Sequence, residues 1–203
     1  MLVSILGMAA SSLAQISEGE RLKARARAQG GKARVMVQGQ MPTAPLEMVA
    51  SEADLIVQGR ISAVEPRFLD AEGMVVTYST VTPTRIYKNA VGAGTARTPS
   101  VTAPIIFVAP GGTVYVDGLE ISYVMESFVP DPPLQIGEEI IAFLKRRPDS
   151  NEFLLHYATF GLLRVNDNKV VAADKLVAKA RPLEDDRLPA VQHRIEQLVK
   201  RVP

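Results

Sequence analysis

Short apolar segments separated by turn residues recur along most of the chain, and this pattern limits the possible folds more than any other feature. Residues 55–64 alternate between two faces, with the period of two of a half-buried β-strand. Asp117-Gly118 lies between two alternating segments and is the strongest hairpin signal in the chain. Further strands are expected near residues 74–87, 101–109, 153–159, 162–165 and 169–172. Many short strands predict a mainly β fold, a small antiparallel OB-like barrel or a sandwich.

Three of these segments indicate how the sheet is built. Gly59 lies in the middle of its strand and permits the sharp coiling of a strand that closes a barrel, so we expect Gly59→Val to disturb closure. Pro83 interrupts the strand at 74–87, which is therefore expected to lie at an edge or to bulge there. Residues 137–144 contain an apolar run on both faces and predict the most central strand.

A helix is expected at each end of the β region. Residues 45–50 predict a short helix, and the last helix is expected to begin near Pro189. That last helix carries one apolar stripe, made of Val191, Ile195, Leu198 and Val202. A chain of 203 residues has room for one domain with appendages, so residues 45–203 are expected to form a single β-barrel domain with a C-terminal helix.

The N-terminal region differs from the rest in charge. Residues 1–44 carry six basic and two acidic side chains, whereas residues 45–203 carry 17 basic and 20 acidic ones. Residues 15–44 are therefore interpreted as a basic, flexible linker, with contact to an anionic lipid or polymer as the alternative.

The first residues resemble a secretory signal peptide. No charged residue occurs before Glu18, and Ser12-Leu13-Ala14 places small residues where a signal peptidase cleaves. Residues 1–14 are thus predicted to be removed, leaving an exported protein, periplasmic or extracellular, without a permanent membrane span. The absence of Lys or Arg before the apolar core leaves an ordinary N-terminal helix as the alternative.

Residue types exclude several chemistries. The chain has no Cys, which rules out disulfides, thiolate zinc sites and Cys nucleophiles. The only two histidines are His156, expected to be partly buried and hydrogen-bonded, and His193, expected on a solvated helix face. The glycine-rich segments do not match phosphate-binding loops, and no Gly-x-Ser-x-Gly nucleophile motif occurs. We therefore expect no cofactor, no metal and no catalytic residue set from local motifs.

Three aromatic residues are the candidate binding residues. Tyr115 and Tyr123 lie on either side of the predicted hairpin turn, and Phe128 follows. Exposed aromatic side chains on neighbouring strands can form a stacking platform for bases or sugars. The alternative is ordinary packing between strands.

Residues 53–173 resemble a group of uncharacterised exported bacterial proteins. The motifs that carry the resemblance are Ala53-Asp54 before the strand with Gly59, Thr77-Tyr78 through Tyr87-Lys88, Pro110-Gly111-Gly112, and Gly137-Glu138 through Phe143-Leu144. This arrangement is also similar to netrin-like domains and tissue inhibitors of metalloproteases, which implies an OB-type barrel. Those domains begin with a Cys that this chain lacks, so their inhibitory chemistry is not implied.

Three functions remain open. The first is a non-enzymatic, exported domain that binds a protein or an envelope component. The second is a cytoplasmic single-stranded nucleic-acid binder, against which the net negative charge of residues 45–203 argues. The third is an enzyme whose site is assembled from distant strands, which would bring several titratable groups into one pocket.

Overall fold

The computed structural model describes residues 16–37, 44–90, 103–125, 132–148, 150, 152–173, 183 and 185–201. The helices are α1 (Glu18–Ala28), α2 (Leu46–Glu52), the 3-10 helix η1 (Ala158–Gly161) and α4 (Leu188–Lys200). The strands are β1 (Lys32–Val37), β2 (Leu55–Leu69), β3 (Met74–Asn89), β4 (Ile105–Pro110), β5 (Gly112–Val116), β6 (Leu119–Met125), β7 (Glu139–Arg146), β8 (Phe153–Leu155), β9 (Leu162–Asn166) and β10 (Lys169–Ala172). The chain is mainly β with a helix near each end of this region, as predicted.

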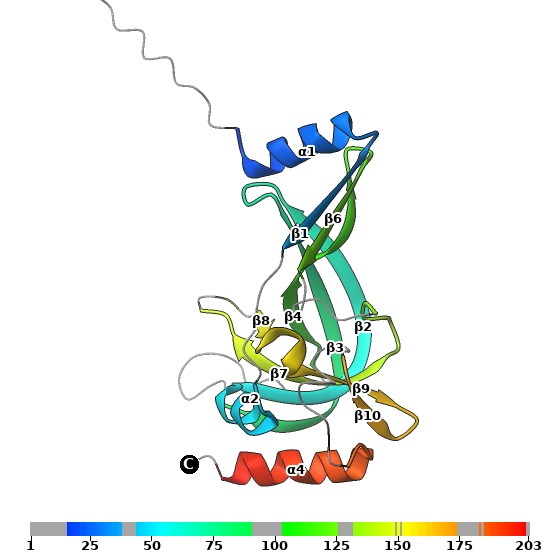
Figure 1. Cartoon of the computed structure of the whole chain (residues 1–203). Coiled ribbons are helices and arrows are strands. Elements are labelled where there is room, and N and C mark those ends of the chain that lie inside the picture. Colours follow the sequence, from blue (N-terminus) through cyan, green and yellow to red (C-terminus); the bar gives the residue numbers. More distant parts are fainter. Residues whose placement is uncertain are drawn as a thin grey trace, which may run out of the picture.

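Most of the larger sheet lies in the lower half of the molecule, and its long strands β2 and β3 continue upward beside the smaller sheet (Figure 1). Its strand order is β10-β9-β7-β2-β3-β4-β8, and β8 also pairs with β7. The pairings therefore return to β7 after five strands, as the predicted small barrel requires. The return is short, because β8 contributes two residue pairs to the parallel contact with β4 and three to the antiparallel contact with β7. This sheet is consequently not a clear barrel.

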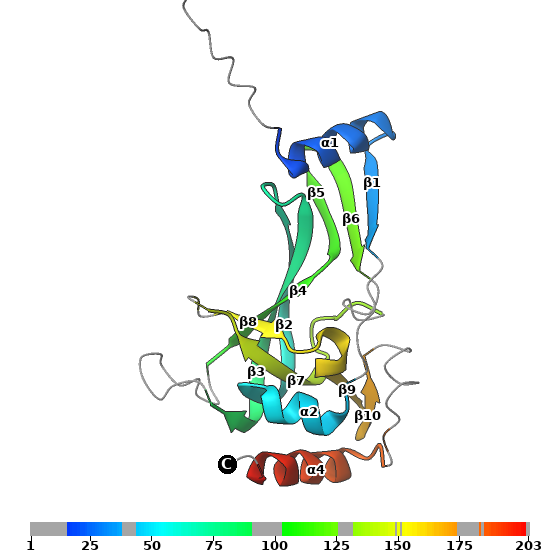
Figure 2. The same ribbon diagram turned by 60° about the vertical axis from the view of Figure 1, so that its left-hand side comes forward.

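Strand β7 is buried on both faces, as its apolar run predicts, but β2 and not β7 lies in the middle of the strand order. Residues 140–144 are all fully buried, and their side chains alternate between two apolar clusters. Ile140, Ala142 and Leu144 pack inside the ring of strands, while Ile141 and Phe143 face α2 and α4. The two helices thus cover the outer face of the lower sheet (Figures 1 and 2).

The pairing of the long strands β2 and β3 explains why Gly59 and Pro83 occur in them. A Cβ atom on Gly59 would lie 2.3 Å from the Thr82 carbonyl oxygen, so this glycine permits a close approach of the strands. Pro83 lies opposite Gly59, at a shift in the pairing register. Pro83 therefore occupies a bulge, one of the two expected places, and β3 itself lies between β2 and β4.

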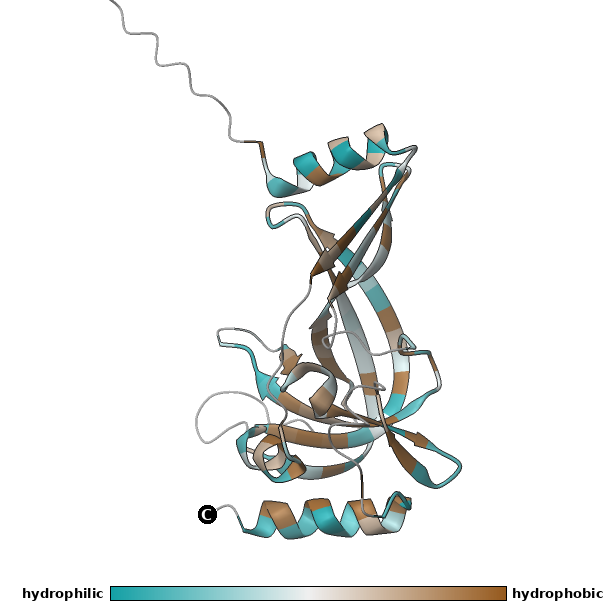
Figure 3. Cartoon of the chain, in the orientation of Figure 1, coloured by the Kyte–Doolittle hydropathy of each residue, from teal (hydrophilic) through white to brown (hydrophobic). Residues whose placement is uncertain are grey.

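The smaller sheet, β1-β6-β5, lies above the larger one with α1 across its end (Figure 2). Its hairpin turns at Asp117-Gly118, both with positive φ, as predicted. A third apolar cluster joins α1, β1 and β6 to the upper ends of β2 and β3. Figure 3 shows apolar residues along β4, β6 and β1, and buried apolar clusters lie in both halves of the molecule.

The structure corrects the interpretation of residues 15–44 as a flexible linker. Residues 18–37 contain α1 and β1, and β1 pairs in parallel with residues 120–125 of β6. Leu22 and Ala26, one helical turn apart, are buried in the upper cluster, while Arg21, Arg25 and Arg27 are exposed. Lys23 is also buried and forms ion pairs with Glu20 and Asp70. The predicted signal peptide at 1–14 lies outside the described residues.

One smaller expectation differs from the structure, and another is confirmed for the described residues. The strand expected at 153–159 ends at Leu155, because a turn with two left-handed residues leads directly into η1. The apolar stripe of α4 buries Val191 and Ile195, and Leu198 packs beside them, as predicted. Val202 lies outside the described residues.

Candidate functional site

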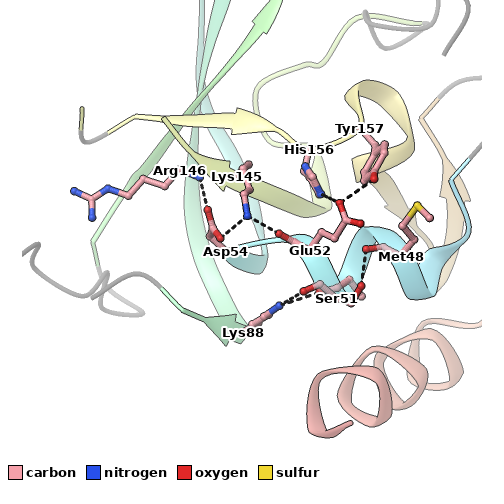
Figure 4. Close-up of polar contacts among 10 residues, drawn as sticks. Met48, Ser51, Glu52, Asp54, Lys88, Lys145, Arg146, His156 and Tyr157 are labelled. Atoms are coloured by element: carbon pink, nitrogen blue, oxygen red, sulfur yellow. Dashed lines mark hydrogen bonds and ion pairs between the residues drawn. The ribbon is translucent and has the colours of Figure 1, made fainter. Parts of the chain in front are cut away.

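The first candidate is a cluster of charged side chains at the C-terminus of α2 (Figure 4). The Lys145 ammonium donates hydrogen bonds to the Glu52 carbonyl oxygen and to Asp54 Oδ1, each at 2.9 Å. Lys88 donates to the carbonyl oxygens of Ser51, at 2.7 Å, and Ala50, at 3.2 Å. The last carbonyls of a helix lack intrahelical partners and carry partial negative charge. Both lysines therefore cap α2 and fasten it to the sheet.

The ionisation of this cluster follows from its contacts. Burial disfavours the charged form of Asp54, but hydrogen bonds from Lys145 and from the Arg146 backbone N–H outweigh it and lower the pKa of the carboxyl. Burial lowers the pKa of the Lys88 ammonium. Lys88 and Lys145 bind the carbonyl oxygens at the end of α2, and Asp54 binds Lys145. The cluster is therefore explained by its role in holding α2 against the sheet.

His156 lies at the edge of the same cluster. Its Nε2 atom is 3.6 Å from Glu52 Oε2, and it has no hydrogen-bond partner among the described residues. Tyr157 donates a hydrogen bond of 2.8 Å to the same Glu52 oxygen. Burial lowers the pKa of His156, which favours the neutral ring. His156 is thus partly buried, as expected, but Nε2 lacks the hydrogen bond expected for the side chain.

The turn that carries His156 is strained. Tyr157 and Ala158 both have left-handed backbones, with φ of 53° and 50°. The chain then returns so closely that a Cβ on Gly161 would lie 1.9 Å from the His156 carbonyl oxygen. Within the described part of the chain, no group of three or more metal-ligating side chains comes together, here or elsewhere.

The second candidate is a mainly apolar cavity of about 290 Å³ at the waist between the two sheets. We call it the waist cavity. Its lining comes from β2, β3, β4, β5 and the segment before β7. The lining residues are Val64, Pro66, Thr77, Ser79, Ala109, Pro110, Gly111, Gly112, Thr113, Pro133 and Leu134.

Strand pairing places the waist cavity on the inner face of the long strands. Val64 lies opposite Ser79, and Pro66 lies opposite Thr77, which in turn pairs with Ala109 of β4. Below this level the same face is filled by the cluster of the lower sheet, and above it by the upper cluster. The waist cavity is therefore an unfilled level in an otherwise packed interior face.

The Pro110-Gly111-Gly112 segment forms one wall, where β4 continues into β5. Gly112 has φ of 128°, and a Cβ there would lie 2.6 Å from Thr77 Oγ1. Thr77 donates its hydroxyl hydrogen to the Gly111 carbonyl oxygen over 2.7 Å. The sequence marks this segment as a turn, but its place beside β2 and β3 depends on pairings that it does not reveal.

The structure separates the predicted aromatic residues. Tyr115 is 73% exposed and pairs with Glu120, to which its hydroxyl donates over 3.1 Å. Tyr123 pairs with Gly112 and packs into the upper cluster, so the two tyrosines lie on opposite faces of the sheet. Phe128 lies outside the described residues. His193 is exposed on α4 and contacts Gln197 at 3.2 Å, consistent with a solvated face.

No family model matches the chain, and a search of curated proteins finds no similar sequence. Among the helices described, none has both the length and the apolar character to cross a membrane.

Proposed function

We propose that this protein is an exported, non-enzymatic binding domain that receives an apolar group of a protein or an envelope component in the waist cavity. The waist cavity is the observation that carries this proposal. Ligand sites are mostly apolar hollows with a few polar groups and volumes of about 300–1,000 Å³, and the waist cavity, at about 290 Å³, lies just below that range. Export is supported by the charge-free segment at 1–14.

The charged cluster supports the non-enzymatic part of the proposal. Lys88 and Lys145 donate to the last carbonyl oxygens of α2, and Asp54 accepts hydrogen bonds from Lys145 and from the Arg146 backbone N–H. These side chains already hold structural hydrogen bonds, so their contacts are explained without a substrate. The proposal therefore assigns this cluster to the stability of the fold.

A pair of substitutions tests the binding site. Ala109 lines the waist cavity, whereas Ala63 pairs with Thr80 on the opposite face of the same sheet. We expect Ala109→Leu to fill the waist cavity and Ala63→Leu to leave it open. The wild type, incubated with an apolar extract of bacterial envelopes, should retain a bound mass in native mass spectrometry. Ala109→Leu should lose that mass and Ala63→Leu should keep it, and equal retention by both variants would refute the proposed site.

Nucleic-acid binding is a second candidate because of one surface. Lys32 and Tyr115 flank Glu120 on the outer face of the small sheet, and Arg34 lies in the next row on that face. Basic and aromatic side chains on one exposed face can bind a single-stranded nucleic acid. In that case an oligonucleotide should bind less tightly as salt rises, and Tyr115→Ser should weaken binding. Tyr123→Phe, on the buried face, is the matched control.

The kinship with netrin-like, OB-type domains also stays a proposal. It is supported by the circuit of five strands in the lower sheet, which includes one parallel pair, β4–β8. A structure of one of the resembling exported proteins, with the same circuit, would strengthen it.

A further inference from the structure

The chemistry of the waist cavity wall limits what it can hold. The described residues that line it include none with a charged side chain. Transfer of a charged group from water into such a place is costly unless an opposite charge or several hydrogen bonds meet it. The wall therefore disfavours a carboxylate, a phosphate or an ammonium group.

The wall carries the hydroxyl groups of Thr77, Ser79 and Thr113, and several of its other polar groups have no hydrogen left to donate. The Thr77 hydroxyl hydrogen is already donated to Gly111, so the Thr77 oxygen can only accept a further bond. The Gly111 N–H is used as well, because it donates to the Val75 carbonyl oxygen at 2.7 Å. Three lining residues have no backbone N–H at all: Pro66, Pro110 and Pro133. A ligand that brings its own N–H or O–H donor is thus matched better than one that brings only acceptors.

The position of the waist cavity limits the size of the ligand. It occupies one level between two packed clusters, and its volume of about 290 Å³ is small for a ligand site. On these grounds we propose that the waist cavity binds a small, uncharged, mainly apolar molecule of one or two rings that carries a single hydrogen-bond donor. This inference rests on the proposed binding function and adds the class of ligand to it.

Three related probes test the class of ligand with the full chain at pH 7. Naphthalene is apolar, 2-naphthol adds one O–H donor, and 2-naphthoate adds a negative charge. We expect 2-naphthol to bind about fivefold more tightly than naphthalene, the equivalent of one hydrogen bond. We expect 2-naphthoate to bind at least about tenfold more weakly than naphthalene. Dissociation constants from protein NMR titrations measure both ratios.

Variants connect these ratios with the wall. Ala109→Leu should abolish binding of all three probes, and Ala63→Leu should leave it unchanged. Thr77→Val keeps the shape but removes the acceptor, so 2-naphthol should lose its advantage while naphthalene binds as before. A thermal melt of each variant confirms that it is folded.

The outcomes separate this inference from the function on which it rests. If 2-naphthoate binds best and Ala109→Leu removes it, the waist cavity is a binding site but the ligand class is wrong. If none of the probes binds while the envelope extract still yields a mass that Ala109→Leu loses, the inference fails and the binding function stands. If Ala109→Leu changes neither experiment, both are refuted.

Discussion

Gly59→Val tests whether the close approach of β2 and β3 is needed for the fold. A Cβ at this position would lie 2.3 Å from the Thr82 carbonyl oxygen and 2.6 Å from Val81 Cγ1. The carbonyl belongs to the paired strand, so it can move only if the strand moves. Overpacking of a tight interior costs about 1–3 kcal/mol, and a contact with backbone belongs at the upper end. We expect the free energy of unfolding to fall by about 3 kcal/mol.

Thermal and urea unfolding, followed by circular dichroism, measure this loss. For a chain of this size, about 3 kcal/mol corresponds to a fall in Tm of about 6–12 °C. Gly59→Ala should cost about 2 kcal/mol, because its single methyl meets the same atoms. Ser62→Val, which puts the same side chain at an exposed position of β2, should change stability by less than about 0.5 kcal/mol. Equal stability of the two valine variants would show that the strand pairing does not need a glycine.

Three further predictions follow from buried charge, burial of a histidine and the N-terminal sequence. Arg164→Met leaves Glu138 without its partner in a buried ion pair and should cost about 3 kcal/mol in urea unfolding, whereas Arg60→Met, in an exposed pair, should cost less than about 1 kcal/mol. Burial lowers the pKa of His156 below the value of about 6.5 in the unfolded chain, so the unfolded state binds more protons and stability should fall as pH drops from 7 to 5. That fall should be smaller in His156→Gln, and an equal fall in both proteins would contradict the assignment. Intact mass spectrometry of fractionated source cells should find a species that begins at Gln15 outside the cytoplasm, and a full-length cytosolic species would exclude the proposed signal peptide.

Local signals in the sequence predict the parts of the fold that depend on neighbouring residues. The apolar run of β7, the Asp117-Gly118 hairpin and the short helix before β2 all occur where expected. The alternation across the hairpin also determines on which face each tyrosine lies. With a two-residue turn, Tyr115 faces Glu120, so Tyr123 must lie on the other face.

Other parts depend on contacts between distant segments and leave little local trace. The sequence does not predict α1 and β1, because the basic residues of α1 suggest a solvated segment. Only Leu22 and Ala26 mark the apolar side of this helix. The waist cavity needs β2, β3 and β4 side by side with Pro133 and Leu134 opposite, and no spacing in the sequence predicts that assembly.

The length of β2 and β3 has a mechanical consequence. These strands of 15 and 16 residues pass through both halves of the molecule, and each half packs its own apolar cluster on them. The β2–β3 pairing continues from the upper half to Gly59. Loss of pairing in the upper half therefore weakens the pairing next to Gly59. The apolar clusters of the lower and upper halves therefore share two continuous strands. We expect amide hydrogen exchange to show that both halves open as one unit.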